Sequence, residues 1–180
     1  MNVFIYSLLV GILICLLLIW YINIYNRYQN YIIRINEAEA NIDSTLRKRF
    51  DLLNKSIGII TANTDKENVL DVIVKLRSKK LTNFELDRKL YEAINEFHKY
   101  REDFPDLKMN EGFMKIELSL NETEAEIVAS RKYYNDIITD YNKLIRTFPS
   151  NVVGKLSKYK LRTYFDGKNM EDDIVNDFKL

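Results

Sequence analysis

The sequence has little of what most enzymes and metal sites depend on. Its 180 residues include one cysteine, which excludes an internal disulfide and a cysteine-based zinc site. They include one histidine, which excludes a histidine-rich metal site. Two prolines and five glycines are too few for an all-β sandwich, which needs a turn roughly every 8–12 residues. A net charge of +1 argues against a dedicated nucleic-acid binder.

Charge is missing from the beginning of the chain. Residues 1–26 contain no Asp, Glu, Lys, Arg or His, and residues 3–22 are almost wholly apolar. A helix of that length spans about 30 Å, the thickness of the hydrocarbon core of a bilayer. Met1-Asn2 lacks the basic start of a signal peptide, no small-residue cleavage pattern follows, and no polar face suits a buried core helix. We therefore predict a retained membrane anchor, with Trp20 and Tyr21 at the interface.

The basic residues that flank this apolar run predict its orientation. No basic residue precedes it, whereas Arg27 and Arg34 follow it. The positive-inside rule then places the C-terminal side in the cytoplasm. The expected location is the cell membrane, crossed once, with a cytoplasmic body and with the lipid bilayer as the partner of the N-terminal helix.

Periodic apolar residues after the run indicate long helices. One face of a helix over about 24–61 is formed by Ile35, Ala38, Ile42, Leu46, Phe50, Leu53, Ile57 and Ile60. A polar break is expected at 61–65. A second stripe runs from Val69 to Phe104, with a helix restart at Thr82 and Glu85, whose spacing forms a capping box. Pro105 should end that helix.

A third stripe is the most regular, and it resembles a coiled-coil seam. Steps of 3 and 4 join Phe113, Ile116, Leu120, Thr123, Ile127, Ser130, Tyr134, Ile137, Tyr141, Leu144 and Phe148. Pro149 should end this helix, and a short fourth helix is expected within 150–165. The tail from Asp166 is acidic and should fray.

The predicted fold class is all-α, with an N-terminal transmembrane helix, an antiparallel bundle of three long helices and a short C-terminal helix. The expected domains are an anchor at 1–26 with its span at 3–22, a bundle at 27–165 and a tail at 166–180. Short turns would make consecutive helices antiparallel. The turn at 105–111 would then lie near the membrane, and both the 62–66 turn and the segment after Pro149 would lie far from it.

The order of motifs in the C-terminal half resembles one family. The motifs are Phe104-Pro105-Asp106-Leu107-Lys108, Asn110-Glu111-Gly112-Phe113, Leu120-Asn121-Glu122-Thr123-Glu124, Ala129-Ser130-Arg131-Lys132-Tyr133-Tyr134-Asn135, Tyr141-Asn142 and Phe148-Pro149-Ser150-Asn151. Upstream are Glu37, Asn41-Ile42, Leu46 and Arg49-x-Asp51-Leu52-Leu53. This series resembles the LemA family of bacterial membrane-anchored helical proteins. The resemblance implies an N-terminal anchor and an antiparallel helical bundle, and it implies no biochemical activity.

Two groups of residues resemble catalytic or metal sites. His98 could carry a phosphate on a helix of a bundle, but His98-Lys99-Tyr100-Arg101 departs from the phosphotransfer pattern, which favours a surface histidine. Glu122, Glu124 and Glu126 resemble a carboxylate cluster, but residues two apart on a helix point in different directions. We therefore interpret the three carboxylates as a solvated face that suits the helix dipole.

Three further polar groups leave alternatives open. Arg47-Lys48-Arg49 lies too far along the helix from the bilayer for a lipid patch, which leaves a solvated face or salt bridges to a neighbouring helix. Arg131, Asn135 and Asn142 form either a buried hydrogen-bond network or a polar flank. The basic residues near the C-terminus suggest a weak nucleic-acid or acidic-partner patch or, as we favour, a docked segment with extended lysines. They are Lys155, Lys158, Lys160 and Arg162, interleaved with Tyr159 and Tyr164.

These patterns predict a non-catalytic scaffold or adaptor at the cytoplasmic membrane surface. We identify no catalytic, cofactor-binding or metal-binding residues, no cofactor and no small-molecule substrate. The expected partner is a protein rather than a nucleic acid, and we expect it to contact the end of the bundle that carries 62–66 and 153–165. The alternative is a signalling component that relays phosphate through His98.

Overall fold

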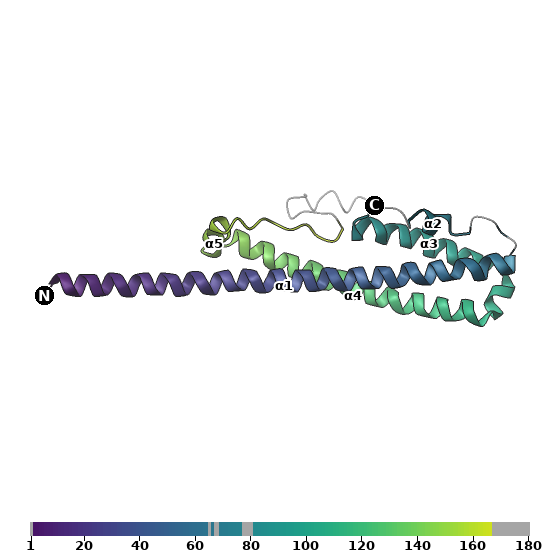
Figure 1. The fold of residues 1–180 in the computed structure, drawn as a ribbon, viewed down its shortest axis with the longest axis horizontal. Helices are drawn as coiled ribbons and strands as arrows, with labels where there is room; N and C mark the ends of the chain where they lie inside the picture. Colours follow the sequence, from purple (N-terminus) through teal and green to yellow (C-terminus); the bar gives the residue numbers. More distant parts are fainter. Residues whose placement is uncertain (1, 65, 67–68, 77–80, 167–180) are drawn as a thin grey trace, which may run out of the picture. The chain divides into compact units, whose positions relative to one another are not determined.

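The computed structural model describes residues 2–64, 66, 69–76 and 81–166, and every regular element among them is helical (Figure 1). The all-α prediction is therefore confirmed. The helices are α1 (Asn2–Thr64), α2 (Asp71–Leu76), α3 (Asn83–Asp103), α4 (Glu111–Arg146) and α5 (Ser150–Leu156), with the 3₁₀ helix η1 (Pro105–Met109) between α3 and α4. The predicted tail from 167 onward, like residues 77–80, lies outside the described residues.

Helix α1 joins the predicted anchor and the first stripe in one uninterrupted element. It continues three residues past the expected end, to Thr64, because the side chains of Asn63 and Thr64 donate to the carbonyls of Ile59 and Ile60 at 2.7 and 2.8 Å. Within the described residues, α1 contains the one segment long and apolar enough to cross a membrane. The side chains of that segment are exposed, whereas regularly spaced side chains are buried from Ile24 onward.

The predicted second helix is divided. Residues of its first part form α2, and α3 begins after Thr82, which caps it through the expected box: Glu85 N donates to Thr82 Oγ1 at 3.3 Å, and Thr82 N donates to Glu85 Oε2 at 3.0 Å. The hydrogen bond from Thr82 N lowers the pKa of the exposed Glu85 carboxyl, and a second bond from Thr82 Oγ1 adds to the shift. Helix α3 ends at Asp103, directly before Phe104 and Pro105, as predicted.

Helix α4 confirms most of the regular stripe. The predicted stripe residues of α4 are buried from Phe113 to Leu144, apart from the half-buried Ser130. Phe148 is the exception, because the helix ends at Arg146 and the Phe148 side chain is 76% exposed. The short helix expected within 150–165 is also present, but it ends at Leu156 and the chain continues without regular structure to Tyr164.

The described chain packs as two compact units. The first combines residues 2–37 with 134–164, and the second combines 38–133 with 165–166. In the second unit, Gly112 at the start of α4 backs onto Ile59 of α1, since a Cβ at 112 would lie 3.1 Å from Ile59 Cδ1. Farther along α4, Glu126 pairs with Lys48 at 3.2 Å. Within this unit α4 therefore runs antiparallel to α1.

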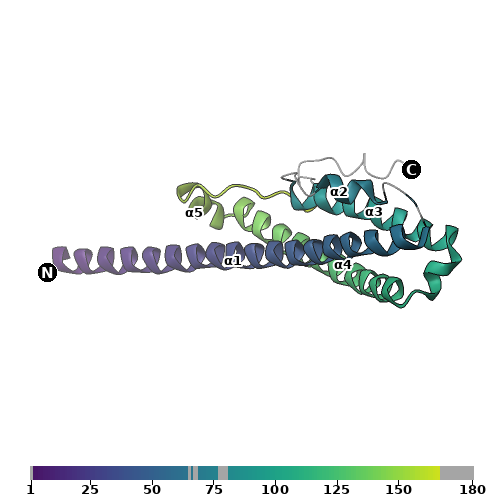
Figure 2. The same cartoon turned by 45° about the vertical axis from the view of Figure 1, so that its right-hand side comes forward.

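Helix α3 runs parallel to α1 in the same unit, contrary to expectation. Asp87 near its start lies beside Arg49, and Phe97 farther along stacks on Phe113 at a centroid distance of 4.4 Å. Helix α2 lies along α3 (Figure 2) and runs in the opposite direction, because Leu70 N donates to Glu96 Oε1 at 3.2 Å while Leu76 lines a groove with Leu81 and Glu85. The 105–111 turn lies beside the C-terminal end of α1, so the antiparallel course of α3, from which we expected a turn near the membrane, is wrong.

The first unit corrects the position of the segment after Pro149. Tyr28 of α1 donates to the carbonyls of Leu144 and Ser150 at 3.0 and 3.1 Å, and Gln29 Nε2 donates to Tyr159 Oη at 2.6 Å. Helix α5 therefore lies beside the first turns of α1 after the apolar run. The segment docks, as we favoured, but next to the apolar run of α1, so the prediction that it lies far from that run is wrong.

Candidate functional site

A buried arginine is the centre of the most concentrated polar site in the second unit. Arg49 of α1 is 1% exposed. Its Nε donates to Thr123 Oγ1 of α4 at 3.1 Å, and its Nη2 forms an ion pair with Glu124 of the same helix. Its Nη1 lies 4.0 Å from Asp87 Oδ1 of α3 and has no hydrogen-bond partner among the described residues. One side chain of α1 thus contacts two other helices, α3 and α4.

A second arginine completes this site. Arg131 Nη2 of α4 donates to the same Asp87 Oδ1 at 2.5 Å, so that carboxylate lies between two guanidinium groups. We call Arg49, Asp87, Thr123, Glu124 and Arg131 the Arg49 cluster. Arg49 and Asp87 are buried whereas Glu124 is half exposed, and the two positive and two negative charges of the cluster balance. These pairs join α1, α3 and α4.

The three consecutive basic residues in α1 therefore have three different environments. Arg47 is exposed and pairs with Asp43 on its own helix at 2.7 Å, whereas Lys48 pairs with Glu126 of α4. Arg49 is buried. The predicted salt bridges to a neighbouring helix are confirmed for Lys48 and Arg49, and the alternative of a solvated face is confirmed for Arg47. Burial of Arg49 was not predicted, although a fixed spacing of 3 from Leu46 already placed it beside the apolar stripe.

The glutamates of α4 act as ion-pair partners rather than as one cluster. Glu124 and Glu126 pair with α1, and Glu122 is exposed. Within the described part of the chain, no group of three His, Cys, Asp or Glu residues could hold a metal ion. His98 is half-buried on α3, with its ring edge-on to Phe97 at 5.7 Å.

A cluster of tyrosines fixes the first unit. The Tyr28 ring lies 6.1 Å from that of Tyr141 of α4 and 4.6 Å from that of Tyr159. Burial raises the pKa of the Tyr28 hydroxyl, and the neighbouring Tyr141 and Tyr159 add to the shift. Burial likewise raises the pKa of Tyr141 and of Tyr159. Tyr28 donates two hydrogen bonds and Tyr159 accepts one, so the cluster joins α1 to α4 and to the C-terminal segment.

The polar residues Arg131 and Asn142, which the sequence grouped with Asn135, take part in two different contacts. Arg131 belongs to the Arg49 cluster, whereas the buried Asn142 accepts from Arg162 N at 2.9 Å and donates to Arg162 O at 2.8 Å. The carbonyl of Asn135 accepts from Thr139 Oγ1 at 2.9 Å. Asn142 therefore holds the C-terminal segment on α4 through both of its amide atoms. Of the two alternatives, the buried hydrogen-bonded site is confirmed for Asn142, whereas Arg131 is half-buried and pairs with Asp87.

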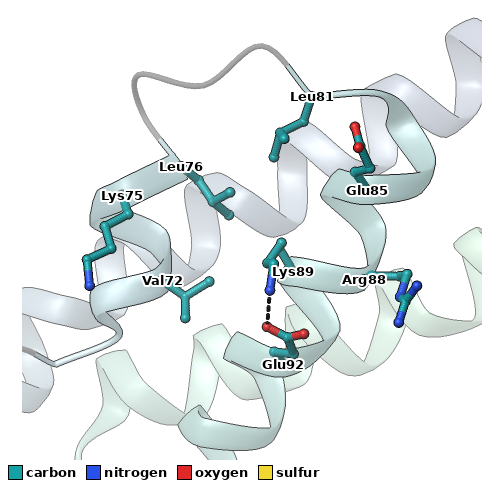
Figure 3. Close-up of a pocket in the computed structure, with 8 residues that line it drawn as sticks. All are labelled: Val72, Lys75, Leu76, Leu81, Glu85, Arg88, Lys89 and Glu92. Carbon is teal, nitrogen blue, oxygen red and sulfur yellow. Dashed lines mark hydrogen bonds and ion pairs between the residues drawn. The ribbon is translucent and has the colours of Figure 1, made fainter.

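A groove of about 470 Å³ separates α2 from the first half of α3 (Figure 3). Val72, Leu76 and Leu81 form its apolar lining. The charged lining residues are Lys75, Glu85, Arg88, Lys89 and Glu92, of which Lys89 and Glu92 pair with each other at 2.8 Å. The groove thus combines three aliphatic side chains with charges of both signs.

The fold and these joints define a class: helical proteins in which an apolar N-terminal segment continues into a bundle. The sequence model of the LemA family matches residues 38–178, and the chain belongs to that family. A curated relative, the protein LemA of Metamycoplasma hominis, is 29% identical over 140 residues. The alignment covers 72% of this chain and 64% of the relative, so the chain spans less than two thirds of that protein's length.

Proposed function

We propose that the protein is a single-pass, membrane-anchored, non-catalytic helical bundle that serves as a scaffold or adaptor at the cytoplasmic membrane surface. One observation carries this proposal. Helix α1 passes without a break from an exposed apolar segment into the packed part of the chain, so the helix that would enter the bilayer also takes part in the bundle.

The exposed apolar segment supports the anchor. Its large side chains include Leu8, Leu9, Leu13, Leu16, Leu17 and Leu18, each more than half exposed. Removing one such side chain from water gains roughly 1.5–3 kcal/mol, so covering the whole segment with lipid gains tens of kcal/mol. Arg27 and Arg34 on its C-terminal side support a cytoplasmic body.

The use of the buried polar groups supports a non-catalytic role. A catalytic site needs a nucleophile, acid or base directed at a substrate. In this protein the converging polar groups are engaged with one another: Arg49 and Arg131 hold Asp87 and Glu124, while Tyr28 and Asn142 hold backbone groups. These contacts join helices, as a scaffold requires.

The groove between α2 and α3 is the surface that we assign to a protein partner. An amphipathic helix is the occupant that fits it, because such helices bury aliphatic side chains in grooves of this kind and place charges along the rim. Val72, Leu76 and Leu81 would receive the apolar side chains, and Lys75 and Arg88 would face carboxylates of the partner.

Site-specific photo-crosslinking in living cells tests this function. A photoreactive amino acid replaces Leu81 in the groove or, in a matched control, the exposed Val128 on α4. The account predicts a discrete crosslinked protein in the membrane fraction from position 81 and not from position 128. The double variant Val72→Asp/Leu76→Asp, crosslinked from 81, should lose that product.

Two results would contradict the proposal. Recovery of the full chain in the soluble fraction after lysis would show that α1 does not anchor the protein in a membrane. The same crosslinked products from 81 and 128 would show that the groove has no specific partner, which would remove the assigned contact surface.

A further inference from the structure

Helix α5 has an exposed apolar side. Val152 and Leu156 recur on it at a spacing of 4 and are 43 and 68% exposed, and Phe148, which precedes the helix, is 76% exposed. The opposite side is buried: Val153 is fully enclosed, and Gly154 lies against Tyr28. A helix with one side docked and an apolar stripe on the other presents an amphipathic surface to its surroundings.

The stripe lies at the level where the apolar run of α1 ends. Ser157 Oγ, just after α5, lies 3.4 Å from Tyr21 Oη. At the other end of α5, Phe148 and Pro149 line a groove together with Trp20 and Ile24. Both ends of α5 therefore meet α1 within the last turn of the apolar run and the first turn after it.

The segment around α5 carries charge of one sign only. Residues 141–165 include no Asp or Glu and six basic side chains: Lys143, Arg146, Lys155, Lys158, Lys160 and Arg162. All six are exposed. An even balance of charge in the whole chain thus conceals a strongly basic region beside the end of the apolar run.

We propose that α5 is a second membrane contact, which lies in the interface of an anionic leaflet. The stripe of Phe148, Val152 and Leu156 enters the boundary between headgroups and acyl chains, and the lysines meet the lipid phosphates. This inference rests on the proposed anchoring of α1. It adds that the body of the protein is held against the bilayer by its own surface, and that lipid charge controls this contact.

Three properties of the region favour lipid over a protein partner. It lies at the depth of the headgroups if α1 crosses the bilayer. It combines aromatic and basic side chains, Trp20, Tyr21 and Phe148 with Lys155 and Lys158, as interfacial regions do. Its charge is mostly positive, although Asp140 also lines the groove at Phe148, and this excess of positive charge matches the negative charge of a phospholipid surface.

Lipid-quenching fluorescence on the full chain in nanodiscs tests the inference. In a Cys15→Ser background, an environment-sensitive dye is attached at Val152→Cys or Leu156→Cys, and at Val128→Cys of α4 as the control. Discs contain phosphatidylcholine alone or mixed with phosphatidylglycerol, together with nitroxide-labelled lipid as the quencher. Trp20, the single tryptophan, reports independently on whether α1 is inserted.

We expect lipid quenching of the dye at 152 and 156 in anionic discs, weaker quenching in phosphatidylcholine discs and none at 128. The exposed-residue variant Lys155→Glu/Lys158→Glu/Lys160→Glu should lose the quenching at 152 while its circular dichroism spectrum stays unchanged. Quenched Trp20 with an unquenched dye at 152 and 156 would overturn the α5 contact and leave the anchor in place. Equal quenching in both disc types would overturn the role of lipid charge. An unquenched Trp20 would overturn the anchor itself.

Discussion

The hydroxyl of Tyr28 lies 3.1 Å from the backbone oxygen of Ser150, although 122 residues separate the two. The same hydroxyl is 3.0 Å from the carbonyl of Leu144. Tyr28, which follows the apolar run of α1, thus holds both the last turn of α4 and the first residue of α5. This contact brings the basic C-terminal segment to the end of the apolar run.

Tyr28→Phe should lower the free energy of unfolding by about 1–2 kcal/mol, because the buried Ser150 carbonyl loses its tyrosine donor. The Leu144 carbonyl is less affected, since Ser150 Oγ also donates to it at 2.7 Å. Urea unfolding in detergent, followed by circular dichroism, measures the effect. The control Tyr91→Phe, at an exposed position of α3, should change the midpoint little. Equal effects of the two variants would contradict the role of Tyr28.

A methyl group at position 154 should be harmful. The Cβ of Gly154→Ala would lie 2.7 Å from Tyr28 Oη, so the tyrosine or α5 must move, at a cost of about 1–3 kcal/mol. Gly58→Ala is the matched control, because nothing lies within 4 Å of a Cβ there and alanine favours a helix interior by about 0.5–1 kcal/mol. Thermal unfolding should shift in opposite directions, and a shift in the same direction would argue against close packing at 154.

Loss of Arg49 should be the most damaging single change in the second unit. Arg49→Ala removes a fully buried side chain together with its contacts to Thr123, Glu124 and Asp87, and truncating a large buried side chain to alanine costs about 2–5 kcal/mol. Arg47→Ala, on a side chain 75% exposed, should cost less than about 1 kcal/mol. Urea titration compares them. Arg49→Lys keeps the charge but not the planar donor geometry, so near-native stability of that variant would show that charge alone is sufficient.

Alkaline pH should loosen the first unit. The folded-state pKa of Tyr28, Tyr141 and Tyr159 is raised, chiefly by burial. Above the unfolded value of about 10, the folded state therefore holds more protons than the unfolded state, and the free energy of unfolding falls as pH rises. Below that pH the contribution is fully present.

Urea midpoints measured on both sides of about pH 10 test this dependence. Lysines titrate in the same range, so the variant Tyr28→Phe separates the two sources: it should flatten the alkaline fall in stability. An unchanged slope in that variant would assign the effect to groups outside the tyrosine cluster.

Local signals in the sequence predicted much of the fold. The capping box at Thr82 and Glu85 and the stop before Pro105 are set by contacts between close neighbours, so the sequence shows them directly. The seam of α4 reflects burial of one helix face, which periodicity reports. Phe148 continued that period past the end of the helix, and a spacing pattern alone does not show where the helix stops.

The sequence did not show the direction of each helix or the contacts between residues far apart in the chain. An apolar stripe has the same period in either direction, so periodicity does not show that α2 runs back along α3 or that α3 runs parallel to α1. Arg49 is buried because carboxylates from two other helices meet it, which no local pattern shows. For the α5 region a signal did exist: 25 residues, 141–165, without a single acidic side chain.

The most direct test of the anchored, cytoplasmic arrangement is thiol accessibility in intact cells. In a Cys15→Ser background, Ala62→Cys reports on the exposed end of α1 beyond the apolar run, and Asn2→Cys reports on the opposite side of that run. With a membrane-impermeant maleimide, the account predicts labelling at position 2 in intact cells, and labelling at position 62 only after lysis. Labelling at position 62 in intact cells would contradict it.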